Sequence, residues 1–369
     1  MAEPLSPMSR LLHHRMQRLA KGDPLALPIT ASSTFYLPGD PDGAHFYGRN
    51  GNPTVEQVEE EIGILEGGEA VLFPSGMAAI ASVFYGYLRP GDTVLVHSDG
   101  YYNVRALLET QFAPMGVHVI TCPTTDMMTA DKTGCRLVMI ETPSNPGLAV
   151  CDIAVIASRA KAAGALLVAD NTTATAICQQ PLDLGADLVV MSDTKAMGGH
   201  SDILAGHVAA RGTSLLEPVK TWRRLAGAIV SPFDAYLLHR GMATLDVRLS
   251  RANANALAAA EALRAHPAVI SVNYPGLTND PSHEIASRQM QGFGPVVSFT
   301  LANRNAAENF IENSDMITAA TSFGGVHTTA ECRVRWGDAV PEGFVRLSCG
   351  IEPTADLVTS LTRALDSLA

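Results

Sequence analysis

Short apolar runs alternate with segments of helical periodicity over most of the first 230 residues, and this pattern predicts an α/β fold. The runs are nearly continuous rather than alternating, as in parallel strands that are covered on both faces. The predicted strands are 70–73, 93–97, 117–121, 136–140, 165–169 and 188–191. The predicted helices between them are 55–66, 77–88, 104–112 and 153–163.

After residues 231–234 the alternation of short apolar runs and helical segments ends. A long alanine-rich helical region covers 235–266, with a possible break near Gly241. Strand-like runs at 269–273 and 296–301 and a final helix at 354–368 follow. We therefore expect an N-terminal arm at 1–45, a large domain at 46–235 and a smaller α+β domain at 236–369.

The first 44 residues are rich in proline and small residues and show little periodicity. Such a segment is expected to lie on another surface, for example a second subunit. At the start of the first predicted helix, Thr54 and Gln57 have the spacing of a capping box.

Composition narrows the function classes. The net charge of −11 and the absence of a dense Lys/Arg block argue against nucleic-acid binding. Residues 70–88 are uncharged, but Pro74, Ser75 and Gly76 divide them into strand, turn and helix, so no membrane span is expected. The N-terminus does not read as a secretory signal, and the six cysteines form no CxxC pair, which predicts a reduced, cytoplasmic protein.

Polar side chains follow three of the predicted strands: Asn145, Asp170, and the group Ser192, Thr194 and Lys195. In open parallel sheets, ligands bind beyond the carboxyl ends of the strands. A lysine and an aspartate there suit pyridoxal phosphate, because the lysine forms an imine and the aspartate keeps the ring nitrogen protonated. The helix that begins near Ser75 offers backbone N–H groups to a phosphate.

Each of these residues also has an ordinary structural explanation. Lys195 could be an exposed lysine in a polar loop, Asp170 could cap a turn, and Ser75 could be a simple N-cap. Tyr101 and Tyr102 could be core or interface aromatics. The convergence of all the polar groups on strand ends favours the functional interpretation.

Eight motifs, in the order of a known family, make the chain resemble the Cys/Met-metabolism branch of the fold-type I pyridoxal-phosphate enzymes. The resemblance runs from about Pro28 to the C-terminus. It implies a mostly parallel central sheet covered by helices and a smaller α+β domain. The motifs are YGRNGNPT at 47–54, PSGM at 74–77, ETPSNP at 141–146, DNT at 170–172, SDTK at 192–195 with GHSD at 199–202, YPGL at 274–277, SFGG at 322–325 and RLSCGIE at 346–352.

The resemblance also implies roles at the cofactor. Lys195 would form the Schiff base and move protons between substrate carbons, Asp170 would pair with the ring nitrogen, and Tyr101 would stack on the ring and assist as acid or base. The implied phosphate ligands are Gly76, Met77, Ser192 and Thr194.

A second set of implied roles concerns the substrate and the partner subunit. Asn145, close to the cofactor, would bind the substrate α-carboxylate together with Ser322 and Arg346. Tyr47 and Arg49 would reach the phosphate site of a neighbouring subunit, which implies a homotetramer built as a dimer of dimers with shared active sites. No metal is expected.

The chain departs from the family pattern at positions expected near the substrate side chain. Tyr102, Asn103 and Val104 replace the usual Gly-Gly-Thr after the stacking tyrosine. Ala196 stands where an aromatic is common, Phe323 replaces a leucine, and His327 replaces an acidic residue. These departures leave the amino-acid substrate open.

The resemblance implies a lyase of the cystathionine γ-lyase type, which releases cysteine, 2-oxobutanoate and ammonia. The open alternatives are γ-replacement, as in cystathionine γ-synthase or an O-acylhomoserine sulfhydrylase, cystathionine β-lyase, and a catalytically inactive paralogue. A nicotinamide-dependent oxidoreductase would need Gly-x-Gly-x-x-Gly after its first strand, which is absent. A Gly-x-Ser-x-Gly hydrolase motif and a His-Glu-x-x-His zinc motif are absent as well.

Overall fold

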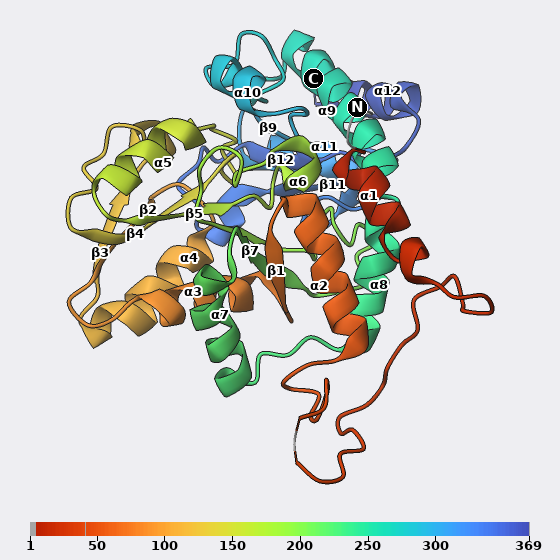
Figure 1. The fold of residues 1–369 in the computed structure, drawn as a ribbon. Helices are drawn as coiled ribbons and strands as arrows, with labels where there is room; N and C mark the ends of the chain where they lie inside the picture. The colour runs from red at the N-terminus through yellow and green to blue at the C-terminus, as the bar shows by residue number, and fades with distance from the viewer. Residues whose placement is uncertain (1–4, 41, 369) are drawn as a thin grey trace.

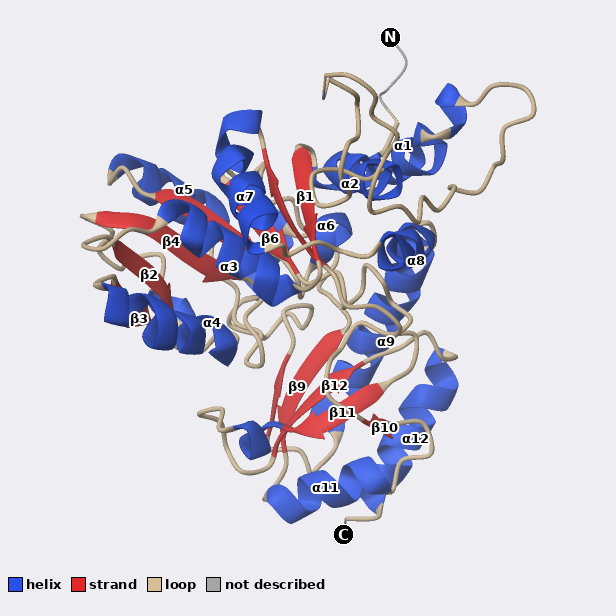
Figure 2. Ribbon diagram, turned by 90° about the horizontal axis from the view of Figure 1, so that it is seen from below, coloured by secondary structure: helices blue, strands red, loops and turns tan. Residues whose placement is uncertain are grey.

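A seven-stranded sheet and a five-stranded sheet, each covered by helices, form the two parts of the chain (Figure 1, Figure 2). The computed structural model describes residues 5–40 and 42–368. In the larger sheet the first strand pairs with the last, β7, which runs antiparallel to both of its neighbours, whereas the other pairs are parallel. The order is β1 (Glu69–Phe73), β7 (Gly206–Ala210), β6 (Leu188–Met191), β5 (Leu166–Asp170), β4 (Cys135–Glu141), β2 (Thr93–His97) and β3 (His118–Cys122). The predicted α/β class is confirmed.

Helices cover both faces of this sheet, which explains why its strands are continuous apolar runs. Along β1, Val71 and Phe73 pack with α3 and α7 on one face, whereas Leu72 packs with α2 on the other. Helix α5 covers the strands β2, β4 and β5 on the face opposite α3 and α4. The helices are α2 (Pro53–Glu66), α3 (Gly76–Tyr87), α4 (Tyr102–Leu107, extended by a π-helical turn at Leu108–Phe112), α5 (Ile153–Ala162), α6 (Thr175–Cys178) and α7 (Thr213–Ala226).

The C-terminal sheet is mainly antiparallel and encloses a core of its own with α9, α11 and α12. Its order is β10 (Thr318–Ala319), β11 (Thr329–Cys332), β12 (Phe344–Ser348), β9 (Val296–Thr300) and β8 (Ser271–Asn273). The helices are α8 (Pro232–Met242), α9 (Leu245–Ala265), α10 (His283–Gln289), α11 (Arg304–Glu312) and α12 (Thr354–Asp366).

The long helix α9 belongs to both parts of the molecule. Leu245 and Leu249 pack in the core that α2 and α8 share, whereas Ala256 and Leu263 pack against the C-terminal sheet. The break expected near Gly241 occurs at Ala243 and Thr244, between α8 and α9. The predicted domain boundary at 235 falls within α8, so the division of the chain at that residue stays a prediction.

The N-terminal segment differs in part from the expected arm. Residues 7–14 form α1, which packs against α2 of its own chain through Leu11 and through His14, whose Nε2 lies 2.8 Å from Glu60 Oε2. The stretch from α1 to α2 then loops away from the body, and Tyr36 on it is 93% exposed (Figure 1). Residues 1–4 and 41 of the predicted arm lie outside the described residues.

The predicted capping box at the start of α2 is wrong. Asn52 is the N-cap, and its Oδ1 accepts hydrogen bonds from the backbone N–H of Thr54 and Val55. Thr54 lies inside the helix, where its hydroxyl donates to the carbonyl of Pro28. Pro53 takes the first helical position, so the N-cap lies two residues earlier than the Thr-x-x-Gln pattern indicates.

A buried charged cluster joins β7 to α2 and to the turn after β6. The His207 ring is fully buried, with Nδ1 2.8 Å from Asp193 Oδ1 and Nε2 3.3 Å from Glu66 Oε1. Burial opposes protonation of the ring, but attraction to Asp193 and Glu66 is stronger and raises the pKa of His207 to about 10. The imidazolium thus neutralises part of the charge of two carboxylates that are also fully buried.

We expect His207→Gln to lower the free energy of unfolding at pH 7 by about 3–5 kcal/mol, because two buried carboxylates lose their cation. Because folding raises the pKa of His207, the protonated ring contributes its full stabilisation below pH 6.5, the pKa of the unfolded state. This stabilisation disappears as the pH rises through about 10. Urea unfolding of both proteins at one concentration, between pH 7 and 10.5, checks this. A difference between the two proteins that does not shrink with rising pH would contradict it.

Candidate active site

A cavity of about 370 Å³ lies where the carboxyl ends of β4, β5 and β6 meet loops of the C-terminal part. Figure 2 shows the two sheets on either side of this layer of loops. Asn145, Asp170 and Lys195 line the cavity from the larger sheet, and Ser322 and Arg346 line it from the smaller one. Residues from two separate sheets therefore meet in one site.

Lys195 follows β6 after a tight turn, in which its N–H donates to the carbonyl of Ser192. Its Nζ donates to Ser322 Oγ at 2.9 Å and lies 5.2 Å from the centre of the Phe323 ring. Burial disfavours the ammonium form and Arg346 repels it, which lowers the pKa of Lys195 to about 8. At pH 7 roughly a tenth of the amine is therefore neutral and nucleophilic, compared with less than about a thousandth at the usual lysine pKa of 10.5.

Asp170 ends β5 and lies opposite Glu141 of β4 in the parallel register. It accepts a hydrogen bond from the N–H of Thr172 at 3.0 Å, and burial raises its pKa. Glu141 accepts from the N–H groups of Tyr101 and Asn145, so it fixes the two loops that flank the cavity. Burial, with Asp170 adding to it, also raises the pKa of Glu141.

An anion-binding end is formed by the first turn of α3. Ser75 caps the helix by accepting from the N–H of Ala78, and within the described residues the N–H groups of Gly76 and Met77 have no acceptor. A Cβ on Gly76 would lie 2.6 Å from the Cβ of Ser192, so only glycine allows this close approach. Thr194 also lines the cavity, and its hydroxyl donates a hydrogen bond to the carbonyl of Ala205 and accepts one from the N–H of Ala205.

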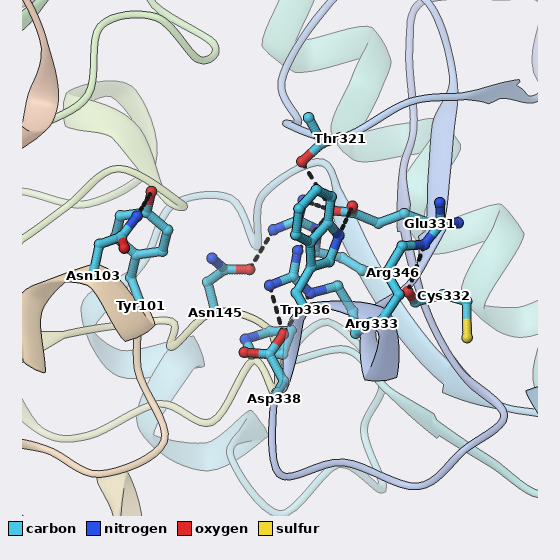
Figure 3. A network of polar contacts seen from close by, with 12 residues as sticks. Tyr101, Asn103, Asn145, Thr321, Glu331, Cys332, Arg333, Trp336, Asp338 and Arg346 are labelled. Atoms are coloured by element: carbon cyan, nitrogen blue, oxygen red, sulfur yellow. Dashed lines mark hydrogen bonds and ion pairs between the residues drawn. The ribbon is translucent and has the colours of Figure 1, made fainter. Parts of the chain in front are cut away.

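Arg346 on β12 is 4% exposed and brings the three predicted carboxylate-binding residues together. One terminal nitrogen donates to Asn145 Oδ1 at 2.6 Å, and the other donates to the carbonyl of Ser322 at 3.0 Å and to Glu331 (Figure 3). Burial lowers the pKa of Arg346 to about 10, which leaves the guanidinium charged at neutral pH. A fixed cation of this kind suits a carboxylate.

Tyr101 precedes α4 and lines the cavity beside Tyr102. Its hydroxyl accepts from Asn103 Nδ2 at 2.8 Å (Figure 3), and burial raises its pKa. Tyr47 and Arg49 do not line the cavity of their own chain. Tyr47 is 42% exposed, and Arg49 donates to the carbonyl of Arg224 at the end of α7.

Two of the expected specificity positions lie elsewhere. Ala196 is buried in the core that includes Met197 and Met242, and His327 is exposed, so neither lines the cavity. The turn after Lys195 directs Ala196 into the core, and the prediction that both positions affect substrate choice stays a prediction. Tyr102 and Phe323, by contrast, do line the cavity.

Three residues of the site escaped the sequence analysis. Glu331 lies within the short strand β11, opposite Arg346 on β12, and Arg333 and Trp336 belong to the 3-10 turn that follows β11 (Figure 3). Both Arg333 and Trp336 line the cavity. The one feature of the sequence that could have indicated these residues is the Glu-x-Arg-x-Arg-Trp cluster at 331–336, which lies in a region without a predicted helix or strand.

The residues present fit pyridoxal phosphate. The cavity holds a depressed-pKa amine at Lys195, a buried carboxylate at Asp170, a flat aromatic at Tyr101 and free helix N–H groups at Gly76 and Met77. These groups suit, in turn, an aldehyde, a ring nitrogen, a ring face and a phosphate. When bound, the cofactor supplies an electron sink for carbanion chemistry.

Comparison with known proteins agrees with this geometry. A Streptomyces coelicolor protein provisionally named cystathionine γ-lyase is 50% identical over 92% of this chain and 88% of its own, and Mycobacterium leprae cystathionine γ-synthase is 40% identical over 92% of both. The crystal structure of Xanthomonas oryzae pv. oryzae cystathionine γ-synthase with aminoacrylate and cysteine superposes with a TM-score of 0.94, at 36% identity and 99% coverage of both chains. The Cys/Met metabolism PLP-dependent enzyme model matches residues 9–366, and the chain belongs to this family of pyridoxal-phosphate enzymes.

Proposed function

We propose that the protein is a cystathionine γ-lyase, which cleaves cystathionine to cysteine, 2-oxobutanoate and ammonia. The observation that carries this proposal is that one cavity is lined by the Lys195 amine, by Asp170 and by the Arg346–Asn145–Ser322 group, with Lys195 in contact with Ser322. This arrangement suits an α-amino acid whose carboxylate is fixed while a mobile amine reaches its carbon atoms. The 50% identical Streptomyces coelicolor relative supports the γ-lyase assignment.

Each residue takes one task in this proposal. Lys195 Nζ would hold the cofactor covalently and would carry protons between Cα, Cβ and the leaving group of the substrate. Asp170 would pair with the ring nitrogen, and Tyr101 would face the ring and assist proton transfer. Gly76, Met77, Ser192 and Thr194 would hold the phosphate.

The substrate α-carboxylate is assigned to Arg346, Asn145 and Ser322. Arg346 is already oriented by Asn145 and by the Ser322 carbonyl, so it loses little conformational freedom when a carboxylate arrives. The Ser322 hydroxyl is the acceptor for Lys195 Nζ, so the carboxylate site and the proton carrier are in contact before the substrate binds.

Two residues that were predicted to bind a phosphate do not line the cavity of their own chain, and this supports a proposal about the quaternary arrangement. Tyr47 and Arg49 lie on the segment that loops away from the body, with the Arg49 guanidinium 5.6 Å from the Tyr47 ring centre. We propose that both bind the phosphate end of a partner's site in a cytoplasmic homotetramer. No helix in the described part of the chain is long and apolar enough to cross a bilayer.

A γ-synthase is the second candidate, because the mycobacterial and Xanthomonas relatives carry that name. Such an enzyme would join an O-acylhomoserine to cysteine. In that reaction the same residues would bind the amino acid. The difference is that the cysteine thiol adds to the γ-carbon after the acyl group leaves, whereas in γ-elimination no thiol adds. β-Lyase chemistry would instead break the other C–S bond of cystathionine.

Product analysis with the purified holoenzyme decides among these. Cystathionine should give cysteine and 2-oxobutanoate, whereas β-cleavage would give homocysteine and pyruvate. Faster formation of cystathionine from acylhomoserine and cysteine than its cleavage would support the synthase. If cystathionine, homocysteine, methionine and acylhomoserine are all left intact, the proposed function is wrong.

We expect Lys195→Ala to abolish the visible absorption of covalently held cofactor and to abolish turnover, while Lys220→Ala, at a partly exposed lysine on α7 that does not line the cavity, retains both. In the wild-type apoprotein, the rate of cofactor capture should rise with pH and level off above about 8, where the Lys195 amine becomes mostly neutral. Stopped-flow absorbance measures this rate. A midpoint near 10.5, the usual lysine value, would contradict the buried environment.

Replacement of Arg346 with alanine should weaken binding of amino-acid substrates by about 2–5 kcal/mol, because a desolvated carboxylate loses its partner. The substrate dependence of the rate gives KM and kcat, and circular dichroism checks that the variant folds. Exposed Arg363, which pairs with Asp315, provides the matched arginine-to-alanine control. Equal KM values for the Arg346 variant and wild type would place the carboxylate elsewhere.

A further inference from the structure

The turn from Arg333 to Trp336 contributes a second guanidinium to the cavity that holds Arg346 (Figure 3). Arg333 is 4% exposed, whereas the neighbouring Arg335 points away from the cavity toward Glu308. A cation that lines a ligand cavity can recognise a charged part of the ligand.

Two carboxylates hold Arg333 in place. Its Nε donates to Asp338 Oδ2 at 2.7 Å, one terminal nitrogen lies 2.5 Å from the same oxygen, and the other donates to Glu331 Oε1 at 2.8 Å. Two of the five N–H bonds of this guanidinium donate to acceptors among the described residues, and the second terminal nitrogen contacts Asp338 as an ion pair. The N–H bonds of the terminal nitrogens that have no such acceptor are available to an anion.

Glu331 places this second cation next to the first. Its Oε1 accepts from both Arg333 and Arg346, so the two guanidinium groups flank one oxygen atom. Its Oε2 accepts from the indole N–H of Trp336 at 2.7 Å. The indole is thereby fixed at the cavity rim, where the side chain is 46% exposed.

We propose that Arg333 binds a carboxylate at the distal end of the substrate's γ-substituent, while Arg346 binds the α-carboxylate. Trp336 packs its ring against the alkyl part of that substituent. The inference rests on the proposed function, and it names the substrate class as amino acids that carry a second carboxylate beyond the γ-carbon. Cystathionine and O-succinylhomoserine have this group, whereas homocysteine and O-acetylhomoserine do not.

The test compares Arg333→Gln with the matched control Arg335→Gln as holoenzymes. Cystathionine and homocysteine both give 2-oxobutanoate by γ-cleavage, so one keto-acid assay follows both. We expect Arg333→Gln to lower kcat/KM for cystathionine by about 10–100-fold, through the loss of a charged hydrogen bond, and to change homocysteine by less than about 2-fold. Arg335→Gln should change neither substrate, and Arg333→Lys should restore part of the loss.

Equal losses with both substrates would show that Arg333 only supports Glu331 and Arg346, and no loss with either would remove it from the site; both results overturn the inference. If the wild type is a synthase, the same comparison uses O-succinylhomoserine and O-acetylhomoserine. We then expect Arg333→Gln to lower kcat/KM for O-succinylhomoserine, which carries the distal carboxylate, and to leave O-acetylhomoserine nearly unchanged. A wild type that acts on none of these four compounds refutes the proposed function itself. A wild type that acts on them without the Arg333 effect refutes only the inference.

Discussion

The guanidinium of Arg346 joins the two halves of the molecule. It belongs to the C-terminal sheet, yet it donates to Asn145, which lies in the loop after β4 of the larger sheet. Almost fully buried, it depends on this amide, the Ser322 carbonyl and Glu331 for its hydrogen bonds. A buried cation that lost these partners would be strongly destabilising, so the same contacts that hold the halves together also preset the site.

The same desolvation that makes Arg346 depend on its partners gives Lys195 its reactivity. An exposed lysine at the end of β6 would be protonated at neutral pH, whereas this one, buried and next to a second cation, has a pKa of about 8. The cost of burying it is offset by the hydrogen bond to Ser322 and by the Phe323 ring. Phe323 also lies 5.1 Å from the Arg346 guanidinium, so one aromatic ring faces both cations.

The strand ends of the larger sheet could be predicted from the sequence because two strong signals coincide there. Runs such as Leu188–Met191 identify buried parallel strands, and the topology rule then brings Asp170 and Lys195 to one edge. Strand β7 was missed because Gly206–Ala210 consists of small residues around a histidine and has no strand-like periodicity. Its glycine is required by packing, since a Cβ on Gly206 would lie 2.5 Å from the backbone of Gly76.

The substrate half of the site could not be predicted in the same way. Its charged residues pair with residues on neighbouring strands, and no local sequence pattern indicates such pairs. Glu331 and Arg346 are cross-strand partners fifteen positions apart, and neither β11 nor β12 shows a clear apolar run. The cofactor groups come from consecutive strand ends of one sheet, whereas the residues assigned to the substrate come from β12, from loops and from a short turn. Loops change without cost to the core, so a family can keep one cofactor chemistry and vary the substrate through segments such as Arg333–Trp336.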